Sequence, residues 1–135
     1  MKEMIMDRFL PRPPVALVVG CDEKERAMAK VLLEESELAV IECDTAKAAR
    51  QAIDQTARSP LAVAFVNIGP SGEMDGMALA QVVKQERPEV QVIVTSVSLD
   101  RRVDDLPEGA ICMAKPWLPL ELLVHAGRAR SNVSA

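Results

Sequence analysis

Short apolar runs alternate with segments of helical periodicity along most of the chain, and this alternation constrains the fold more than any other feature. Five runs have the length of a single buried strand: residues 15–19, 38–41, 61–66, 90–94 and 110–114. Continuous apolar runs of this kind are typical of strands buried on both faces. Strands that alternate with helices imply βαβ units, whose right-handed crossovers give a parallel sheet covered on both sides. We therefore predict an α/β fold with a doubly wound, five-stranded parallel sheet.

Apolar residues at helical spacing fill most of the intervals between these runs. The predicted helices cover residues 23–35, a segment capped by Thr45, the segment that ends before Pro88, and residues 118–130. The interval 97–109 is polar and contains a proline, so any helix there is expected to be short or absent.

The chain has 135 residues, which favours one domain with one hydrophobic core. We expect a flexible arm over residues 1–13, a folded domain over 14–130 and a short tail over 131–135. That tail is too short for an output domain, so a stand-alone module is expected.

Composition excludes several classes of function. The net charge is −4 and no basic stripe is present, which argues against nucleic-acid binding. No apolar run approaches the ~20 residues of a membrane span, and the N-terminus lacks a signal-peptide core. Cys21, Cys43 and Cys112 are widely spaced and form neither a disulfide framework nor a CxxC motif. We expect a soluble, cytoplasmic protein with reduced cysteines.

The residues that follow the predicted strands carry the chemistry. In an open parallel sheet, ligands bind at the carboxyl ends of the strands. These ends supply a carboxylate pair, an amide, two hydroxyls and an ammonium group, from Asp22-Glu23, Asn67, Thr95-Ser96 and Lys115. We expect these side chains to meet at one edge.

Four segments give the chain a family resemblance over roughly residues 14–130: Ala16–Val19, Gly69–Gly76, Val92–Ser96, and Lys115-Pro116-Trp117 followed by a helix. Together they resemble the receiver domains of two-component response regulators. The resemblance implies a flavodoxin-like sheet of order 2-1-3-4-5, a cis Lys115–Pro116 bond and a role in signal transduction.

Receivers use an acidic pair to hold Mg²⁺, an aspartate to accept the phosphoryl group, and a hydroxyl and a lysine to contact its oxygens. By this resemblance, Thr95 supplies the hydroxyl and Lys115 the lysine. The phosphoacceptor position falls on Asn67, whose neutral amide has no anionic oxygen to attack phosphorus.

Two further positions depart from the family pattern. The acidic pair falls on Gly20 and Cys21, with Asp22 and Glu23 one and two residues late, unless the loop slips by two residues. The aromatic switch of the family falls on Cys112. We therefore expect no cofactor and at most weak Mg²⁺ binding.

Three functions are compatible with these residues. The resemblance favours a non-enzymatic pseudo-receiver that contacts a histidine kinase or another signalling protein and is not phosphorylated at Asn67. The alternatives are a phosphoryl acceptor that uses another carboxylate, such as Asp22 or Asp75, and a regulatory domain that binds a small anion through Thr95 and Lys115.

Two of the residues at the carboxyl edge of the predicted sheet also have a purely structural interpretation. Asn67 is suited to capping a turn, and Lys115 to pairing with Asp22 or Glu23.

The last helix has more apolar residues than one core stripe needs, so we predict a homodimer through the face of the fifth strand and this helix. These residues are Leu118, Leu120, Leu122, Leu123 and Val124.

Overall fold

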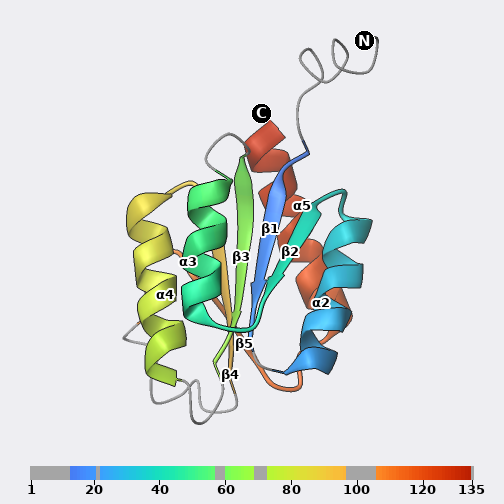
Figure 1. The fold of residues 1–135 in the computed structure, drawn as a ribbon. Coiled ribbons are helices and arrows are strands. Elements are labelled where there is room, and N and C mark those ends of the chain that lie inside the picture. The colour runs from blue at the N-terminus through green and yellow to red at the C-terminus, as the bar shows by residue number, and fades with distance from the viewer. Residues whose placement is uncertain (1–12, 21, 57–59, 69–72, 97–105, 135) are drawn as a thin grey trace, which may run out of the picture.

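The computed structural model describes residues 13–20, 22–56, 60–68, 73–96 and 106–134. Within these residues, five parallel strands form one sheet in the order β2-β1-β3-β4-β5 (Figure 1). The strands are β1 (Val15–Val19), β2 (Ala39–Cys43), β3 (Leu61–Asn67), β4 (Gln91–Ser96) and β5 (Ile111–Ala114). The helices are α2 (Glu23–Glu35), α3 (Ala46–Gln55), α4 (Glu73–Glu86) and α5 (Pro119–Ser134). This architecture confirms the predicted fold class and strand order.

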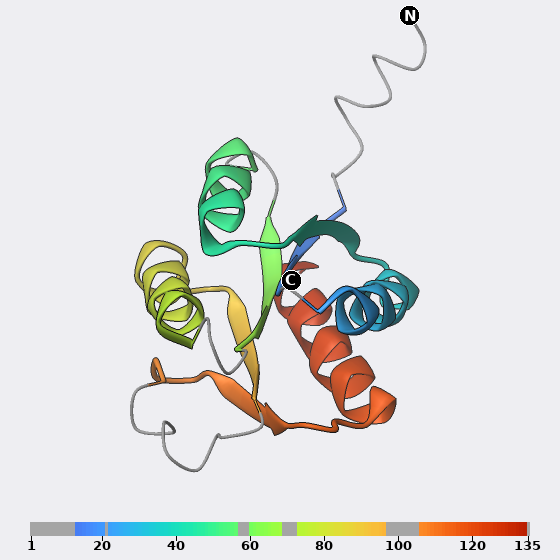
Figure 2. The same ribbon diagram turned by 60° about the horizontal axis from the view of Figure 1, so that its bottom comes forward.

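The helices cover the two faces of the sheet in pairs. Helices α3 and α4 pack on one face, and α2 and α5 pack side by side on the other (Figures 1 and 2). Each pair encloses its own apolar core. One core contains Ile53 of α3 and Val83 of α4, and the other contains Leu33 of α2 and Leu122 of α5.

Strand β1 shows why its sequence is apolar throughout. All five of its residues are buried. Leu17 and Val19 face the core under α3 and α4, whereas Ala16 and Val18 face the core under α2 and α5. A strand with a helix layer on each side has no solvent face, so no polar alternation is expected in it.

Side-chain caps fix where the first two described helices begin. The carboxylate of Asp22 accepts hydrogen bonds from the backbone N–H groups of Lys24 and Glu25, at 3.1 and 3.3 Å. The hydroxyl of Thr45 accepts from the N–H of Ala48 at 3.0 Å, as the sequence predicted. The cap of α2 directs the start of that helix towards the carboxyl edge of the sheet (Figure 1).

Three strand or helix ends differ from the expected ones by two residues or more. Strand β2 continues through Glu42 to Cys43, because the Glu42 side chain lies against α2 and pairs with Arg26 at 3.6 Å. Strand β4 continues through Thr95 and Ser96, which are both buried. Helix α5 continues to Ser134, through most of the segment expected to be a tail.

Some expectations fall outside the described residues. These are the arm, of which residues 1–12 are not described, and residues 97–105 of the polar interval. The rest of that interval, residues 106–109, and residue 110 are described and form no helix. No helix in the described part of the chain is long and apolar enough to cross a membrane.

Candidate functional site

The carboxyl ends of β3, β4 and β5 meet at one edge of the sheet, which Figure 2 turns towards the viewer. Asn67 is the direct neighbour of Thr95 in the β3–β4 register. The N–H of Lys115 donates to the carbonyl of Ser96 at 3.3 Å, which fixes the start of the following loop beside β4. The Lys115–Pro116 peptide bond is cis, as the resemblance implied. Asn67, Thr95 and Lys115 therefore lie together.

A carboxylate from helix α2 lies among them. Oε1 of Glu25 accepts a hydrogen bond from Oγ1 of Thr95 at 2.8 Å. Oε2 of Glu25 forms an ion pair with Nζ of Lys115 at 3.3 Å. The same Nζ donates to Oδ1 of Asn67. Lys115 thus bridges one charged and one neutral oxygen, and the three groups carry no net formal charge.

Trp117 closes the site on the side of the β5–α5 loop. Its Nε1 donates to Oε1 of Glu25 at 3.3 Å, and its ring meets the buried ring of Phe65 edge to face at 5.6 Å. This packing anchors the loop. The Glu25 side chain is 11% exposed, and that of Lys115 is 20% exposed. Ion pairs with so little solvent access are screened less than surface pairs.

Gly20 lies against Asn67 on the other side. A Cβ atom built on Gly20 would be 2.7 Å from Cβ of Asn67, which is closer than real Cβ atoms approach another heavy atom. The backbone N–H of Gly20 is held by the carbonyl of Cys43 at 3.0 Å, so the strand end is fixed there. A side chain at position 20 and Asn67 in its present place exclude each other.

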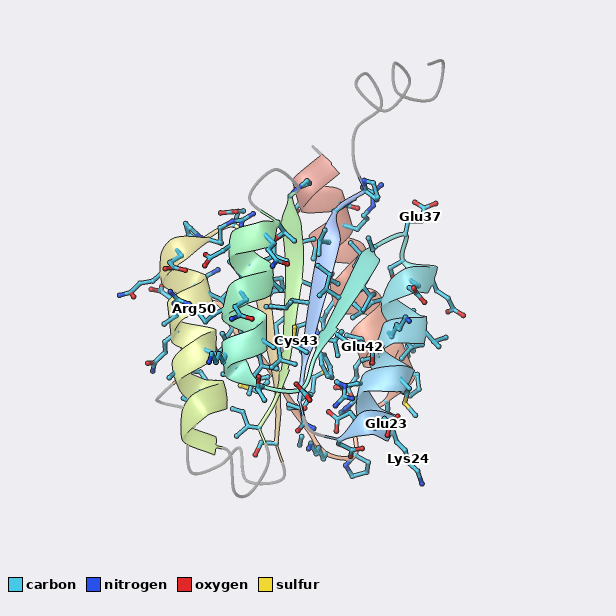
Figure 3. All side chains as sticks on the ribbon, in the orientation of Figure 1. Glu23, Lys24, Glu37, Glu42, Cys43 and Arg50 are labelled. Carbon is cyan, nitrogen blue, oxygen red and sulfur yellow. The ribbon has the colours of Figure 1, made fainter. Side chains whose placement is uncertain are left out.

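Asp22 and Glu23 belong to the start of α2. Asp22 is the N-cap of this helix and accepts hydrogen bonds from two of its N–H groups, whereas the side chain of Glu23 is exposed. Figure 3 shows Glu23 beside Lys24 at the outer end of α2. Cys21 lies outside the described residues.

The partner of Lys115 is Glu25 rather than the expected Asp22 or Glu23. The reason is helical geometry, because the Asp22 carboxylate is engaged by backbone amides while Glu25 lies further into the first turn and reaches the sheet edge. Sequence reasoning missed Glu25. It could have been considered because it is an acidic residue in the first turn of a helix that begins near the carboxyl edge of the predicted sheet.

A second cation flanks the edge. The guanidinium of Arg26 donates to the carbonyl of Gly20 and pairs with Glu42 of β2 at 3.6 Å. Figure 3 places Glu42 on β2, towards the start of α2. Positive charge therefore faces the backbone at the position where the family resemblance places a metal-binding acid.

No protein-family model matches the chain, and no curated protein matches it. Solved structures do match. The receiver domain of the Francisella response regulator 1452 is 21% identical with a TM-score of 0.71, over 89% of this chain and 98% of that one. The receiver domain of NtrX from Brucella abortus is 25% identical with a TM-score of 0.70, over 86% and 98%.

The chain has the fold of a response-regulator receiver domain. It also aligns with a longer NtrX chain from Brucella abortus at 25% identity and a TM-score of 0.73. That alignment covers 91% of this chain and 28% of the longer one, so this chain corresponds to less than a third of that protein.

The Mg²⁺ ion that the receiver resemblance implies does not fit the residues present. Gly20 offers no side chain and no room for one, and the amide oxygen of Asn67 accepts from Lys115. Among the described residues, no three His, Cys, Asp or Glu side chains are grouped as metal ligands. An ammonium group at the amide oxygen repels a divalent cation.

Cys112, which the family resemblance aligns with the aromatic switch position, lies on β5 opposite Val94. Burial raises the pKa of its thiol, and burial together with the neighbouring Asp44 carboxylate raises the pKa of the Cys43 thiol. Both cysteines are therefore held as neutral thiols at physiological pH, where they behave as apolar residues.

Proposed function

We propose that this chain is a cytoplasmic signalling module that acts through contacts with other proteins and accepts no phosphoryl group at residue 67. The observation that carries the proposal is the pair made by Lys115 and the neutral amide of Asn67 at the end of β3. In a phosphoryl acceptor that oxygen must be an anionic nucleophile, and an amide oxygen is not one. The role proposed is therefore binding, with a histidine kinase or another signalling protein as partner.

The surroundings of Asn67 support the same proposal. Phosphoryl transfer to a carboxylate needs cations that offset the repulsion between two anionic groups. Gly20 provides no acid for a metal, and Lys115 is already paired with Glu25. The alternative acceptor Asp22 has its carboxylate committed to the cap of α2, which argues against it as a nucleophile.

Incubation with acetyl phosphate and Mg²⁺, followed by intact-mass measurement, tests the proposal. We expect the mass to stay unchanged under conditions that phosphorylate an ordinary receiver run in parallel. An adduct of one phosphoryl group that is lost on treatment with base would contradict the proposal. Peptide mapping would then show whether Asp22, Asp75 or another carboxylate carries it.

A strip of exposed apolar side chains, at the start of α5 and in the residue before it, supports a role in protein contacts. Of the five apolar residues predicted for a docking face, Leu122 is buried in the core, whereas Leu118, Leu120 and Val124 are 65%, 68% and 42% exposed. Exposed apolar side chains grouped on one part of the surface are typical of interaction sites. We propose a second copy of the chain as the occupant, because such a strip is self-complementary across a two-fold axis.

Light scattering across a concentration series tests this dimer. We expect a dimer at micromolar concentration and a monomer for the variant Leu118→Lys/Leu120→Lys. The variant Glu34→Lys, which also adds a cation at an exposed helix position, is the matched control and should remain dimeric. A monomeric parent protein would contradict the proposed dimer.

A further inference from the structure

The Glu25 carboxylate uses both of its oxygens on donors from separate segments of the chain. Oε1 accepts from the hydroxyl of Thr95 and the indole N–H of Trp117, which lie 70 and 92 residues away in sequence. Oε2 pairs with the ammonium group of Lys115. A side chain in the first turn of a helix is normally solvated, so this placement requires a specific set of partners.

The three donors form a site that suits an oxyanion. A hydroxyl, an indole N–H and an ammonium group converge on one small volume, and hydrogen bonds to a charged acceptor are the strong class. Thr95 is fully buried, so its hydroxyl depends on a protein acceptor. The donors come from β4 and from the loop after β5, and the acceptor comes from α2.

The site has a path to solvent. An open cavity of about 390 Å³ lies beside the carboxylate, and it is lined by Lys24, Glu25, Met28, Lys115, Pro116 and Trp117. Lys24 is the second cationic residue of its lining, after Lys115. Lys24, Glu25 and Met28 belong to the N-terminal part of α2, so the cavity lies beside the start of that helix, where Figure 3 labels Lys24.

We propose that Glu25 is a built-in ligand of an oxyanion site formed by Thr95, Lys115 and Trp117, and that this site binds a small free oxyanion once Glu25 is removed. The inference goes beyond the proposed function, because it concerns what fills the site and not whether residue 67 accepts a phosphoryl group. A tethered carboxylate has a high effective concentration at its own donors, so it outcompetes free anions in the parent protein.

Chemical rescue tests the proposal. The variant Glu25→Ala is titrated with sodium acetate and, separately, with inorganic phosphate, while sodium chloride keeps the ionic strength constant. Trp117 is the one tryptophan in the sequence, so its fluorescence reports on the site directly. We expect saturable fluorescence changes with dissociation constants on the order of 1–10 mM, together with a rise in melting temperature.

Two controls isolate the site. The parent protein and the variant Glu23→Ala, which removes an exposed acid from the same helical turn, should give neither response. The variant Glu25→Ala/Lys115→Met should lose the response to both anions. The proposal is overturned if Glu25→Ala responds no more than Glu23→Ala does, or if the response survives the loss of Lys115.

A second measurement keeps the proposal testable if Glu25→Ala does not fold. In the isosteric variant Glu25→Gln, the indole N–H resonance of Trp117 should move upfield in a ¹H–¹⁵N spectrum, because a charged acceptor becomes neutral. The variant Glu23→Gln should leave it in place. An unchanged Trp117 resonance in Glu25→Gln would overturn the proposal.

Discussion

Replacement of Gly20 by alanine is expected to lower the free energy of unfolding by about 1–3 kcal/mol, the cost typical of forcing one extra carbon into a well-packed site. The added Cβ would lie 2.7 Å from Cβ of Asn67, so either the end of β1 or Asn67 has to move. Neither moves freely, because the N–H of Gly20 donates a hydrogen bond to the carbonyl of Cys43 and the Asn67 side chain accepts one from Lys115. Urea denaturation measures the change.

Gly127 provides the matched control for this substitution. It lies within α5, and a Cβ atom there meets no other atom within 4 Å. Glycine in a helix interior is destabilising relative to alanine, so Gly127→Ala should raise the free energy of unfolding by about 0.5–1 kcal/mol. The account of Gly20 is wrong if both substitutions shift stability in the same direction.

Replacement of Lys115 by methionine is expected to lower the free energy of unfolding by about 1.5–3 kcal/mol, which is the range for hydrogen bonds to a charged group. Methionine keeps much of the length of the side chain but leaves Oε2 of Glu25 and Oδ1 of Asn67 without their cationic partner. The loss should change little with salt, because the pair is shielded from solvent. Thermal and urea denaturation at low and high ionic strength check both statements.

Lys30 serves as the control for Lys115. It pairs with Glu42 at 3.7 Å, but the two side chains are 42% and 36% exposed. Exposed pairs contribute little, so Lys30→Met should change the free energy of unfolding by less than about 1 kcal/mol. Equal losses of stability for Lys30→Met and Lys115→Met would mean that the Glu25–Lys115 ion pair contributes no more than an exposed pair.

The strands and their order could be predicted because burial on two faces leaves a direct mark on the sequence. Val15–Val19 and Leu61–Val66 are apolar at every position, and the structure buries each of these residues. Polar residues near the ends of strands were harder to predict. Glu42 and Thr95 are polar residues inside strands, and they are held there by side-chain partners on α2 that no local pattern reveals.

The rim residues Asn67, Thr95 and Lys115 could be placed together because parallel strands bring their carboxyl ends to one edge. Glu25 could not be placed in this way. Its donors are far away in sequence, and an acid in the first turn of a helix has an ordinary explanation in the helix dipole. Only the packing of α2 against the sheet distinguishes Glu25 from its exposed neighbour Glu23.

The approach of Gly20 to Asn67 was also beyond sequence reasoning. A glycine after a strand predicts a turn or a close contact, but it does not identify the neighbour. The structure identifies Asn67, and this contact joins two of the departures from the receiver pattern into one feature. The Asn67 side chain fills the space that a side chain at position 20 would need.

If Glu25, Lys115 and Asn67 form one charge-balanced unit, a neutral residue is required at position 67. A double-mutant cycle of Glu25→Gln and Asn67→Asp, read by urea denaturation, tests it most directly. Two carboxylates on one ammonium group repel each other, whereas a carboxylate and an amide do not. We predict that Asn67→Asp is less favourable by about 1 kcal/mol in the parent protein than in Glu25→Gln. Additive effects, or a coupling of the opposite sign, would contradict the account.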